Sequence, residues 1–211
     1  MRYILSLFTF LLLPSLAFAG STASYKADMG KMHDAMHMQY SAQPDTDFAR
    51  GMIPHHQGAV DMARTVLQYG EDDTIAYLAN AIIVSQVEEI GIMNRWLNRR
   101  GYPEPTSDVP AESTRQFHAD MRKMHHAMNI EYTGNADLDF VCGMIPHHQG
   151  AIDMAAVEVS EGRKPEMLAL APRIILQQQA DIALMRRWLN RTNQHCALQS
   201  DMMHHSGEHH G

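Results

Sequence analysis

Histidine and methionine side chains recur in a short motif that the chain carries twice. Residues 51–63 read GMIPHHQGAVDMA, and residues 143–155 read GMIPHHQGAIDMA. Each copy places two adjacent histidines after a proline and between two methionines. Imidazole nitrogens bind Zn²⁺, Cu²⁺ and Ni²⁺, whereas thioether sulfur is a soft donor that suits Cu(I) and is poor for Mg²⁺ or Ca²⁺. The motif therefore predicts a site for a transition-metal ion.

A stripe of the same residue types precedes each motif. Residues spaced i, i+3, i+4 and i+7 share one face of a helix, and methionines at this spacing are usually part of the core. Residues 25–40, however, contain no Leu, Ile, Val or Phe. A histidine buried among thioethers would also lack a hydrogen-bond partner unless it bound a metal. We therefore expect the stripes to serve as core and as ligands: Met29, Met32, His33 and Met36 in the first, and Met121, Met124, His125 and Met128 in the second.

A third group lies further along each copy. Glu89 and Met93 fall on one helix face, as do Asp181 and Met185. The two methionines could complete a metal site. The two carboxylates could accept the second ring proton of a ligand histidine and so orient its ring.

These groups together define two predicted ligand sets. Either each copy holds its own ion, or one site is shared between the copies. The first set is Met29, Met32, His33, Met36, His37, Met52, His55, His56, Met62 and Met93. The second set is Met121, Met124, His125, His126, Met128, Met144, His147, His148, Met154 and Met185.

The segment after the second copy is also rich in soft and borderline ligands. We expect it to be a flexible metal-collecting arm that binds Cu(II) or Zn(II) more weakly than the helices bind Cu(I). Its predicted ligands are His195, Cys196, Met202, Met203, His204, His205, His209 and His210.

A tandem duplication carries all of these residues. ADMGKMHDAM at 27–36 matches ADMRKMHHAM at 119–128, and a longer match links 82–99 to 174–191, always at an offset of 92 residues. The duplication and a Pro-rich segment between the copies predict the domain organisation. The expected parts are a signal peptide over 1–19, a first helical repeat over 20–100, a linker over 101–113, a second repeat over 114–193 and a tail over 194–211.

Helices are the elements that must position the ligands. Residues 25–42 and their counterparts are rich in helix formers, and no alternating strand pattern is present. Asp45 and Asp137 are predicted to cap the next helix. Pro54 and Pro146 predict a kink or a helix start there. At a helix start the positive end of the dipole would keep the following histidines neutral, as a metal requires. Three or four helices per repeat predict tandem antiparallel bundles.

Composition and charge limit the possible location and partners of the protein. A positive Arg2, an apolar run over residues 4–13 and the sequence AFA ending at Ala19 are typical of a secretory signal peptide. Without Arg2 the net charge is 16 − 24 = −8 with neutral histidines, and there is no Lys/Arg block, which argues against nucleic acid as a partner. We expect no membrane insertion of the mature chain. Cys142 and Cys196 either form one bridge or remain two thiols.

The sequence MIPHHQGAVDMA, followed by a helix with the pattern Q..EI..M..WL, resembles the domain of unknown function 305 family. The resemblance covers both repeats, residues 25–100 and 117–192. It implies a ferritin-like helical fold and an exported protein. Some tandem members of the family are implicated in binding copper in the periplasm and in copper resistance. Most members have no assigned activity.

Three functions of different classes remain in view. The leading hypothesis is a periplasmic protein that sequesters Cu(I) or hands it to another periplasmic copper carrier or an efflux component. The first alternative is a copper-dependent redox enzyme that oxidises Cu(I), although a blue-copper site would need His₂Cys ligation. The second is a helical module whose Met-rich groove binds a protein partner without metal. The ferritin-like di-iron pattern Glu-x-x-His is absent from both repeats.

Overall fold

Each repeat folds into three helices. The computed structural model describes residues 15–100 and 111–197, and these ranges are all-α. The first repeat forms α1 (Ser15–Met36), α2 (Pro44–Tyr69) and α3 (Asp73–Arg100). The second repeat forms α4 (Glu112–Ala127), α5 (Ala136–Glu161) and α6 (Pro165–Thr192). The predicted all-α fold is confirmed.

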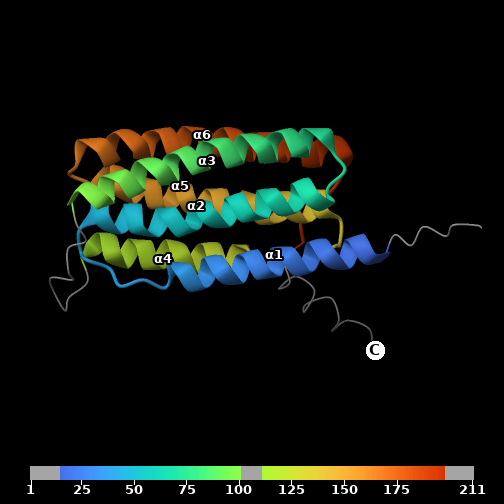
Figure 1. Cartoon of the computed structure of the whole chain (residues 1–211), viewed down its shortest axis with the longest axis horizontal. Helices are drawn as coiled ribbons and strands as arrows, with labels where there is room; N and C mark the ends of the chain where they lie inside the picture. The colour runs from blue at the N-terminus through green and yellow to red at the C-terminus, as the bar shows by residue number, and fades with distance from the viewer. Residues whose placement is uncertain (1–14, 101–110, 198–211) are drawn as a thin grey trace, which may run out of the picture.

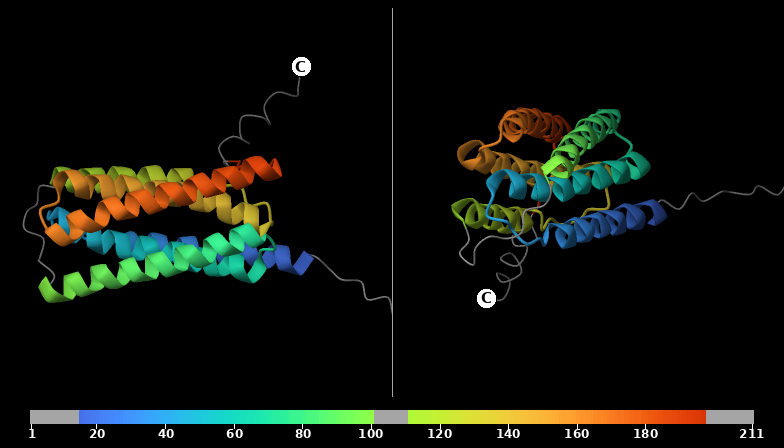
Figure 2. Two further views of the ribbon diagram at one scale, coloured as in Figure 1. Left: turned by 90° about the horizontal axis from the view of Figure 1, so that it is seen from above. Right: turned by 60° about the vertical axis from the view of Figure 1, so that its left-hand side comes forward.

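The six helices lie in three layers (Figure 1). The middle layer is made of α2 and α5, which pack against each other across the repeat boundary. One side of it is covered by α1 and α4, and the other by α3 and α6, as the further views in Figure 2 also show. The buried residues of both repeats form one continuous hydrophobic cluster. The two repeats therefore share a core instead of forming two separate bundles.

Contacts between equivalent residues show how the repeats are related. The rings of His33 and His125, which are 92 positions apart, have centroids 4.4 Å apart. The same offset separates His55 and His147, whose ring centroids are 3.9 Å apart. A residue meets its own counterpart only on a twofold axis. A pseudo-twofold axis therefore passes between α1 and α4 and between α2 and α5.

Aromatic contacts follow the same symmetry. Tyr25 of α1 stacks on Tyr132 of the second repeat, with centroids 6.3 Å apart. The counterparts of these residues, Phe117 and Tyr40, stack at 6.1 Å. Each outer helix is thus packed against the loop of the other repeat. The buried hydroxyl of Tyr25 adds a hydrogen bond to the backbone oxygen of Ala136, at 2.9 Å.

The predicted helix caps are wrong in detail. The residues at the N-caps of α2 and α5 are Gln43 and Asn135, and the side chain of Asn135 accepts a hydrogen bond from the backbone nitrogen of Leu138. Asp45 and Asp137 lie in the first turns of these helices and are buried. Their carboxylates accept hydrogen bonds from the backbone at the start of a different helix.

Each of these aspartates binds the backbone at the start of a helix in the other repeat. Asp45 Oδ1 accepts from the backbone nitrogens of Arg163 and Lys164, at 2.9 and 2.6 Å, just before α6. Asp137 Oδ2 does the same for residues 71–72, at 2.8 and 3.3 Å, just before α3. Backbone N–H groups at a helix start have no partner within the helix, so these bonds join the repeats while they complete the helices.

The outer helices end earlier than the composition predicts. The expected helix over 25–42 ends at Met36, and the chain then crosses to α2. The carboxylate of Asp47 holds this crossing by accepting from the backbone nitrogen and hydroxyl of Ser41, at 2.7 and 2.8 Å. Asp139 binds Thr133 in the same way in the second repeat. These side-chain bonds replace the helical bonds that the sequence pattern favours.

The prolines of the motif do not begin a helix. Pro54 lies inside α2 and Pro146 inside α5, and both helices continue through them. Proline removes one backbone hydrogen bond and disfavours a helix interior, which is why the sequence predicts a kink or a helix start. Tertiary packing of the middle layer overrides that preference. Pro165, by contrast, lies in the first turn of α6 as predicted.

A disulfide settles the state of the two cysteines. Cys142 on α5 is bonded to Cys196, with their Cα atoms 5.3 Å apart. The bridge attaches the segment after α6 to the middle layer, and the backbone nitrogen of Glu131 adds a hydrogen bond to the oxygen of Ala197. The first repeat has Arg50 at the position of Cys142, so this staple belongs to the second repeat alone.

Several predicted segments fall partly or wholly outside the described residues. These are most of the signal peptide (1–14), most of the linker (101–110) and most of the tail (198–211). Among the helices that are described, α3 is long and apolar enough to cross a membrane. Core helices of water-soluble proteins meet the same test, and α3 packs along α2.

One buried acid breaks the symmetry of the core. Glu158 on α5 is fully buried, neither carboxyl oxygen has a hydrogen-bond partner, and its counterpart in the first repeat is Val66. Burial, with the nearby negative charge of Asp45, raises the pKa of Glu158 to about 9. The folded state therefore holds a proton that the unfolded state releases above its ordinary pKa. The contribution of Glu158 to the free energy of unfolding is therefore fully present below its ordinary pKa, and it is lost progressively as pH rises towards 9.

We predict that Glu158→Val stabilises the protein at neutral and alkaline pH. The expected gain is about 1–3 kcal/mol near pH 8, because an unsatisfied buried polar group is removed. The gain should shrink as pH falls below the ordinary pKa of 4.5, where both the folded and the unfolded wild type are protonated. Thermal unfolding followed by circular dichroism across this range measures it. Glu161→Val, an exposed position on the same helix, is the control, and an equal effect of both changes would contradict the argument.

Candidate metal centre

The four histidines of the repeated motif lie in the core. His55 and His56 on α2 and His147 and His148 on α5 have no exposed surface. They stand in the interior of their helices, so the helix-start argument for their neutrality does not apply. Burial lowers the pKa of His55 and His147 well below the usual histidine value, and it also lowers that of His148. These three rings are therefore neutral near pH 7, and neutral imidazole is the form that binds a metal.

The inner histidine of each motif meets its counterpart on the pseudo-twofold axis. The ring centroids of His55 and His147 are 3.9 Å apart. The outer histidines, His56 and His148, are turned away, with centroids 6.2 and 6.1 Å from their neighbours in sequence. The structure thus brings the two motifs together, as a site shared between the repeats would require.

The outer histidines contact the predicted carboxylates. His56 Nε2 lies 2.8 Å from Glu89 Oε2 of α3 in a hydrogen bond. His148 Nε2 lies 3.4 Å from Asp181 Oδ2 of α6, a longer contact. Both carboxylates are buried, with exposures of 5% and 4%. Their predicted contact with imidazole rings is present, and for His56 it is a hydrogen bond that orients the ring.

Most of the remaining ring nitrogens have no hydrogen-bond partner. Both nitrogens of His147 and both nitrogens of His148 lack one, and so does Nδ1 of His55 and His56. An unsatisfied buried polar atom costs about 1–3 kcal/mol, so such atoms are rare without a reason. Among the described residues, no group of three His, Cys, Asp or Glu side chains could hold a metal ion. A third protein ligand for an ion at these nitrogens would therefore come from another residue type.

Methionine supplies the missing donor at the axis. Met124 of α4 places its sulfur 3.2 Å from Nε2 of His55, across the repeat boundary. Metal–nitrogen bonds of about 2.0 Å and metal–sulfur bonds of about 2.3 Å let both atoms bind one ion at this separation. Thioether and neutral imidazole are together a soft, uncharged ligand pair.

Two glycines make room for the methionines. A Cβ atom at Gly58 would lie 2.6 Å from the sulfur of Met32, and one at Gly150 would lie 2.6 Å from the sulfur of Met124. Any side chain here would push the thioethers away from α2 and α5. Sequence reasoning missed both glycines. The signal was available, since each stands three residues after the inner histidine in both copies of the motif.

The other predicted ligands occupy several places. Met62 and Met154 pack across the repeat boundary, where they contact the positions of Gly143 and Gly51. The remaining buried methionines are part of the common hydrophobic cluster, and Met29 and Met121 pack at its edge. The buried ones are Met36, Met52, Met93, Met128, Met144 and Met185.

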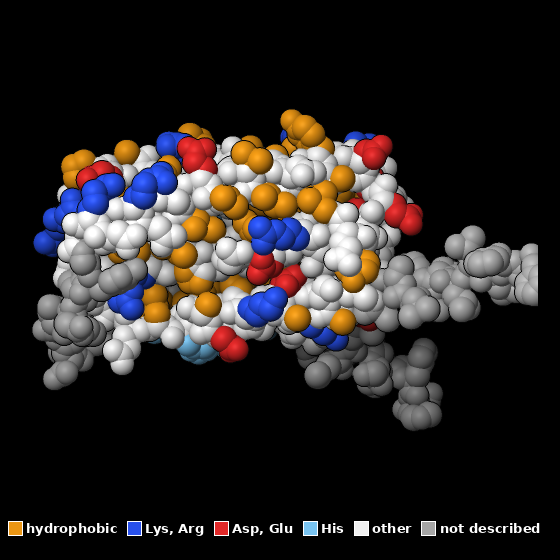
Figure 3. All heavy atoms as spheres, in the orientation of Figure 1, with side chains coloured by type: hydrophobic (Ala, Val, Ile, Leu, Met, Phe, Trp, Pro, Cys, Tyr) orange, Lys and Arg blue, Asp and Glu red, His pale blue; other side chains and the backbone are white. Residues whose placement is uncertain are grey.

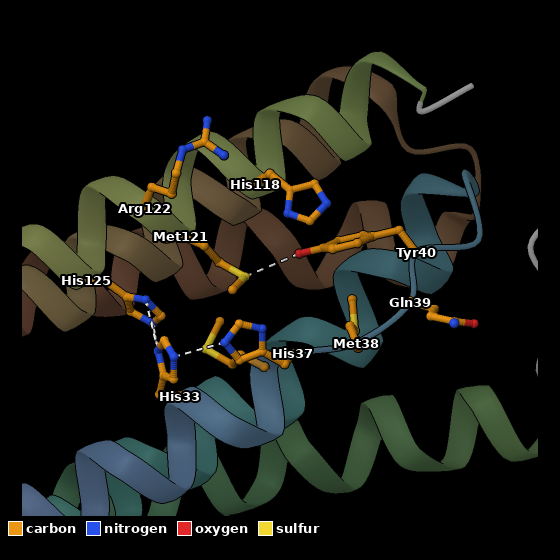
Figure 4. Close-up of a pocket in the computed structure, with 10 residues that line it drawn as sticks. His33, His37, Met38, Gln39, Tyr40, His118, Met121, Arg122 and His125 are labelled. Carbon is orange, nitrogen blue, oxygen red and sulfur yellow. Dashed lines mark hydrogen bonds between the residues drawn. The ribbon is translucent and has the colours of Figure 1, made fainter. Parts of the chain in front are cut away.

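The stripe histidines form a second cluster at the surface. His33 Nδ1 lies 3.1 Å from Nδ1 of His125, and His33 Nε2 lies 2.9 Å from Nε2 of His37 (Figure 4). Figure 3 shows histidine side chains reaching the surface at the edge where α1 and α4 meet. Next to them, the hydroxyl of Tyr40 donates to the sulfur of Met121, at 3.3 Å. Tyr40 was not predicted as part of this region.

The described part of the tail does not match its predicted role in full. Cys196 is consumed in the disulfide with Cys142, so it cannot act as a thiolate ligand. His195 lines a pocket of about 480 Å³ beside the bridge. The other predicted tail ligands lie outside the described residues.

Comparison with known proteins gives matches in sequence and in fold. The domain of unknown function family DUF305 matches residues 45–189 and, in a second match, residues 137–210. The uncharacterised protein L153 of Acanthamoeba polyphaga mimivirus is 41% identical over 56 residues, which is 26% of this chain and 37% of that protein. The chain thus aligns with less than half the length of this curated relative.

Two solved structures extend the comparison. CopM in its Cu(I)-bound form is 32% identical, with 72% of this chain and 98% of that chain covered and a TM-score of 0.54. CopM structures with Cu(II) and with silver match to a similar degree. A DUF305 protein from Streptomyces coelicolor, described as a candidate secreted protein, is 26% identical over 74% of this chain and 96% of that chain, with a TM-score of 0.59. Since the family matches well over half of the residues, the chain belongs to the DUF305 family.

Proposed function

We propose that this protein is an exported copper-binding protein that holds Cu(I) at a buried Met/His site between its two repeats. The observation that carries the proposal is the 3.2 Å contact of Met124 sulfur with His55 Nε2, beside a His147 ring whose two nitrogens have no partner. These donors come from both repeats. A bound ion would satisfy buried nitrogens that the protein itself leaves unsatisfied.

The chemistry of the donors favours Cu(I) over divalent ions. Thioether and neutral imidazole bring no negative charge, and Zn²⁺ sites usually draw on thiolate or carboxylate as well. Burial of a monovalent ion also costs less than burial of a divalent one. Glu89 and Asp181 are held by the outer histidines, and they supply balancing negative charge near the site.

The relatives support a copper-related role. CopM, to which this chain is 32% identical over nearly the whole CopM chain, has been solved with Cu(I), Cu(II) and silver. Silver(I) shares the soft character of Cu(I). We carry this ligand class to the present chain because its buried Met/His pair offers soft, uncharged donors.

The role that fits this site is sequestration or delivery in copper homeostasis and resistance. The motif histidines are fully buried, which suits retention of a bound ion. We therefore propose binding without catalytic turnover. The signal-like N-terminus supports a location in the periplasm or outside the cell, where another copper carrier or an efflux component would receive the ion.

The first prediction concerns His147, whose two nitrogens lack partners. His147→Leu should lower Cu(I) affinity at least tenfold, because a ligand is lost, and should raise the Tm of the copper-free protein, because unsatisfied buried nitrogens are removed. Anaerobic competition with a chromophoric Cu(I) chelator and thermal unfolding measure the two effects. Because the proposed site is shared between the repeats, this single substitution should weaken all of the tight Cu(I) binding. Retention of one full-affinity copper would indicate separate sites.

The second prediction concerns selectivity. Met124→Leu should reduce Cu(I) affinity about tenfold or more while leaving Zn²⁺ binding almost unchanged, because only the soft donor is removed. Met167→Leu, another fully buried methionine outside the ligand sets, is the matched control. Equal loss for both variants would show that the effect comes from packing. Equal loss for both metals would remove the sulfur argument.

The third prediction separates the tail from the bundle. A chain ending at Ala197 keeps the disulfide and lacks the His/Met-rich remainder. It should lose weak Cu(II) and Zn(II) binding, which depends on pH near the histidine pKa of about 6.5, and keep tight Cu(I) binding. Equilibrium dialysis with elemental analysis distinguishes the two classes. Loss of the tight class would place that site in the tail instead.

A further inference from the structure

Open pockets flank the surface histidine pair on both sides. A pocket of about 520 Å³ is lined by His33, His37, His125 and Met121, among others. A second, of about 580 Å³, is also lined by His33 and His125. This pair lies on the same pseudo-twofold axis as the buried pair. It is therefore the point at which the axis reaches solvent between α1 and α4.

The surface histidines are poorly arranged to keep an ion. The two ring nitrogens of His33 point to different partners, His125 at 3.1 Å and His37 at 2.9 Å. Both ring nitrogens of His33 are thus engaged, and an ion here must replace these hydrogen bonds between rings. The cluster is also open to both pockets, so an ion bound here can exchange. In contrast, Nδ1 of His55 and both nitrogens of His147 are fully buried and have no hydrogen bond to lose.

On each side of the axis, a methionine connects the surface histidines with the buried histidines. Met32 and Met124 directly precede His33 and His125 in sequence, and both are 3% exposed. The sulfur of Met124 reaches His55, and that of Met32 lies over Gly58 on α2. Each helix thus presents an imidazole outward and a thioether inward at adjacent positions. Methionine side chains are flexible, so their sulfurs can follow a moving ion.

We propose that His33 and His125, with His37, form a capture site for Cu(I), and that Met32 and Met124 pass the ion along the axis to His55 and His147. This proposal rests on the proposed function, since the buried pair is the destination. The route leads from a site that exchanges its ion to one that retains it. No electron transfer is required, because the ion keeps its oxidation state and changes only its ligands.

The test compares the rate of Cu(I) loading with the equilibrium affinity for Cu(I). The double variant His33→Ala with His125→Ala should load Cu(I) from a chromophoric chelator at least tenfold more slowly in anaerobic stopped-flow measurements. Its equilibrium affinity for Cu(I) should stay within about twofold of the wild type. Removal of copper by excess chelator should slow by the same factor, because the same path serves both directions.

His118→Ala is the matched control, because His118 is an exposed histidine on α4 that packs on Tyr40 and lines only one of the two pockets. It should load at the wild-type rate. Unchanged rates in the double variant would overturn the capture site. A large loss of affinity would show that the surface histidines belong to the retaining site itself. If the wild type failed to bind Cu(I) tightly, the proposed function would fail instead.

Discussion

The packing of α2 against α5 is the constraint on which the rest of the structure depends. It brings each residue near the axis close to its own counterpart, so that His55 meets His147. A layer with four fully buried histidines is costly unless their nitrogens are satisfied. The carboxylate of Glu89 on α3 satisfies one nitrogen of His56, and Asp181 on α6 lies 3.4 Å from His148. The thioether of Met124 on α4 approaches His55. Under the proposed function the three layers thus have distinct roles: orientation of histidines by α3 and α6, ligands from the middle layer, and access for the ion between α1 and α4.

Much of the fold was predictable because the signals were local and repeated. Helix-forming composition, the constant offset of 92 residues and Pro165 all indicate helices that the structure contains. The helix ends were less predictable. Asp45 and Asp137 look like caps in sequence, but their partners lie more than sixty residues away, and a linear pattern does not show such pairings. Pro54 fails as a boundary for the same reason, since packing of the whole helix outweighs one lost hydrogen bond.

The candidate site, like the fold, was predictable from the sequence only in part. Residue types and helical spacing identified the histidines, the two carboxylates and Met124, because these depend on one helix at a time. The grouping of ligands depends on how helices of different repeats meet. Hence Met62, placed in the first set, packs against Gly143 of the second repeat, and Met124 approaches a histidine of the first. Cys196 cannot be a ligand because it is bonded to Cys142. These two cysteines are 54 residues apart in the sequence, so a local pattern does not show the pairing.

The axis through the histidine pairs gives the chain the architecture of an isologous dimer whose two copies have been joined covalently. In a true homodimer every change appears twice. Joining the copies in one polypeptide removes that obligation, and this chain shows the result: Glu158 opposite Val66, His37 opposite Asn129, and Cys142 opposite Arg50. The disulfide and the buried acid each exist once, near a core that keeps its symmetry at the histidines. Fusion thus lets the two halves specialise while the shared centre is still built from both.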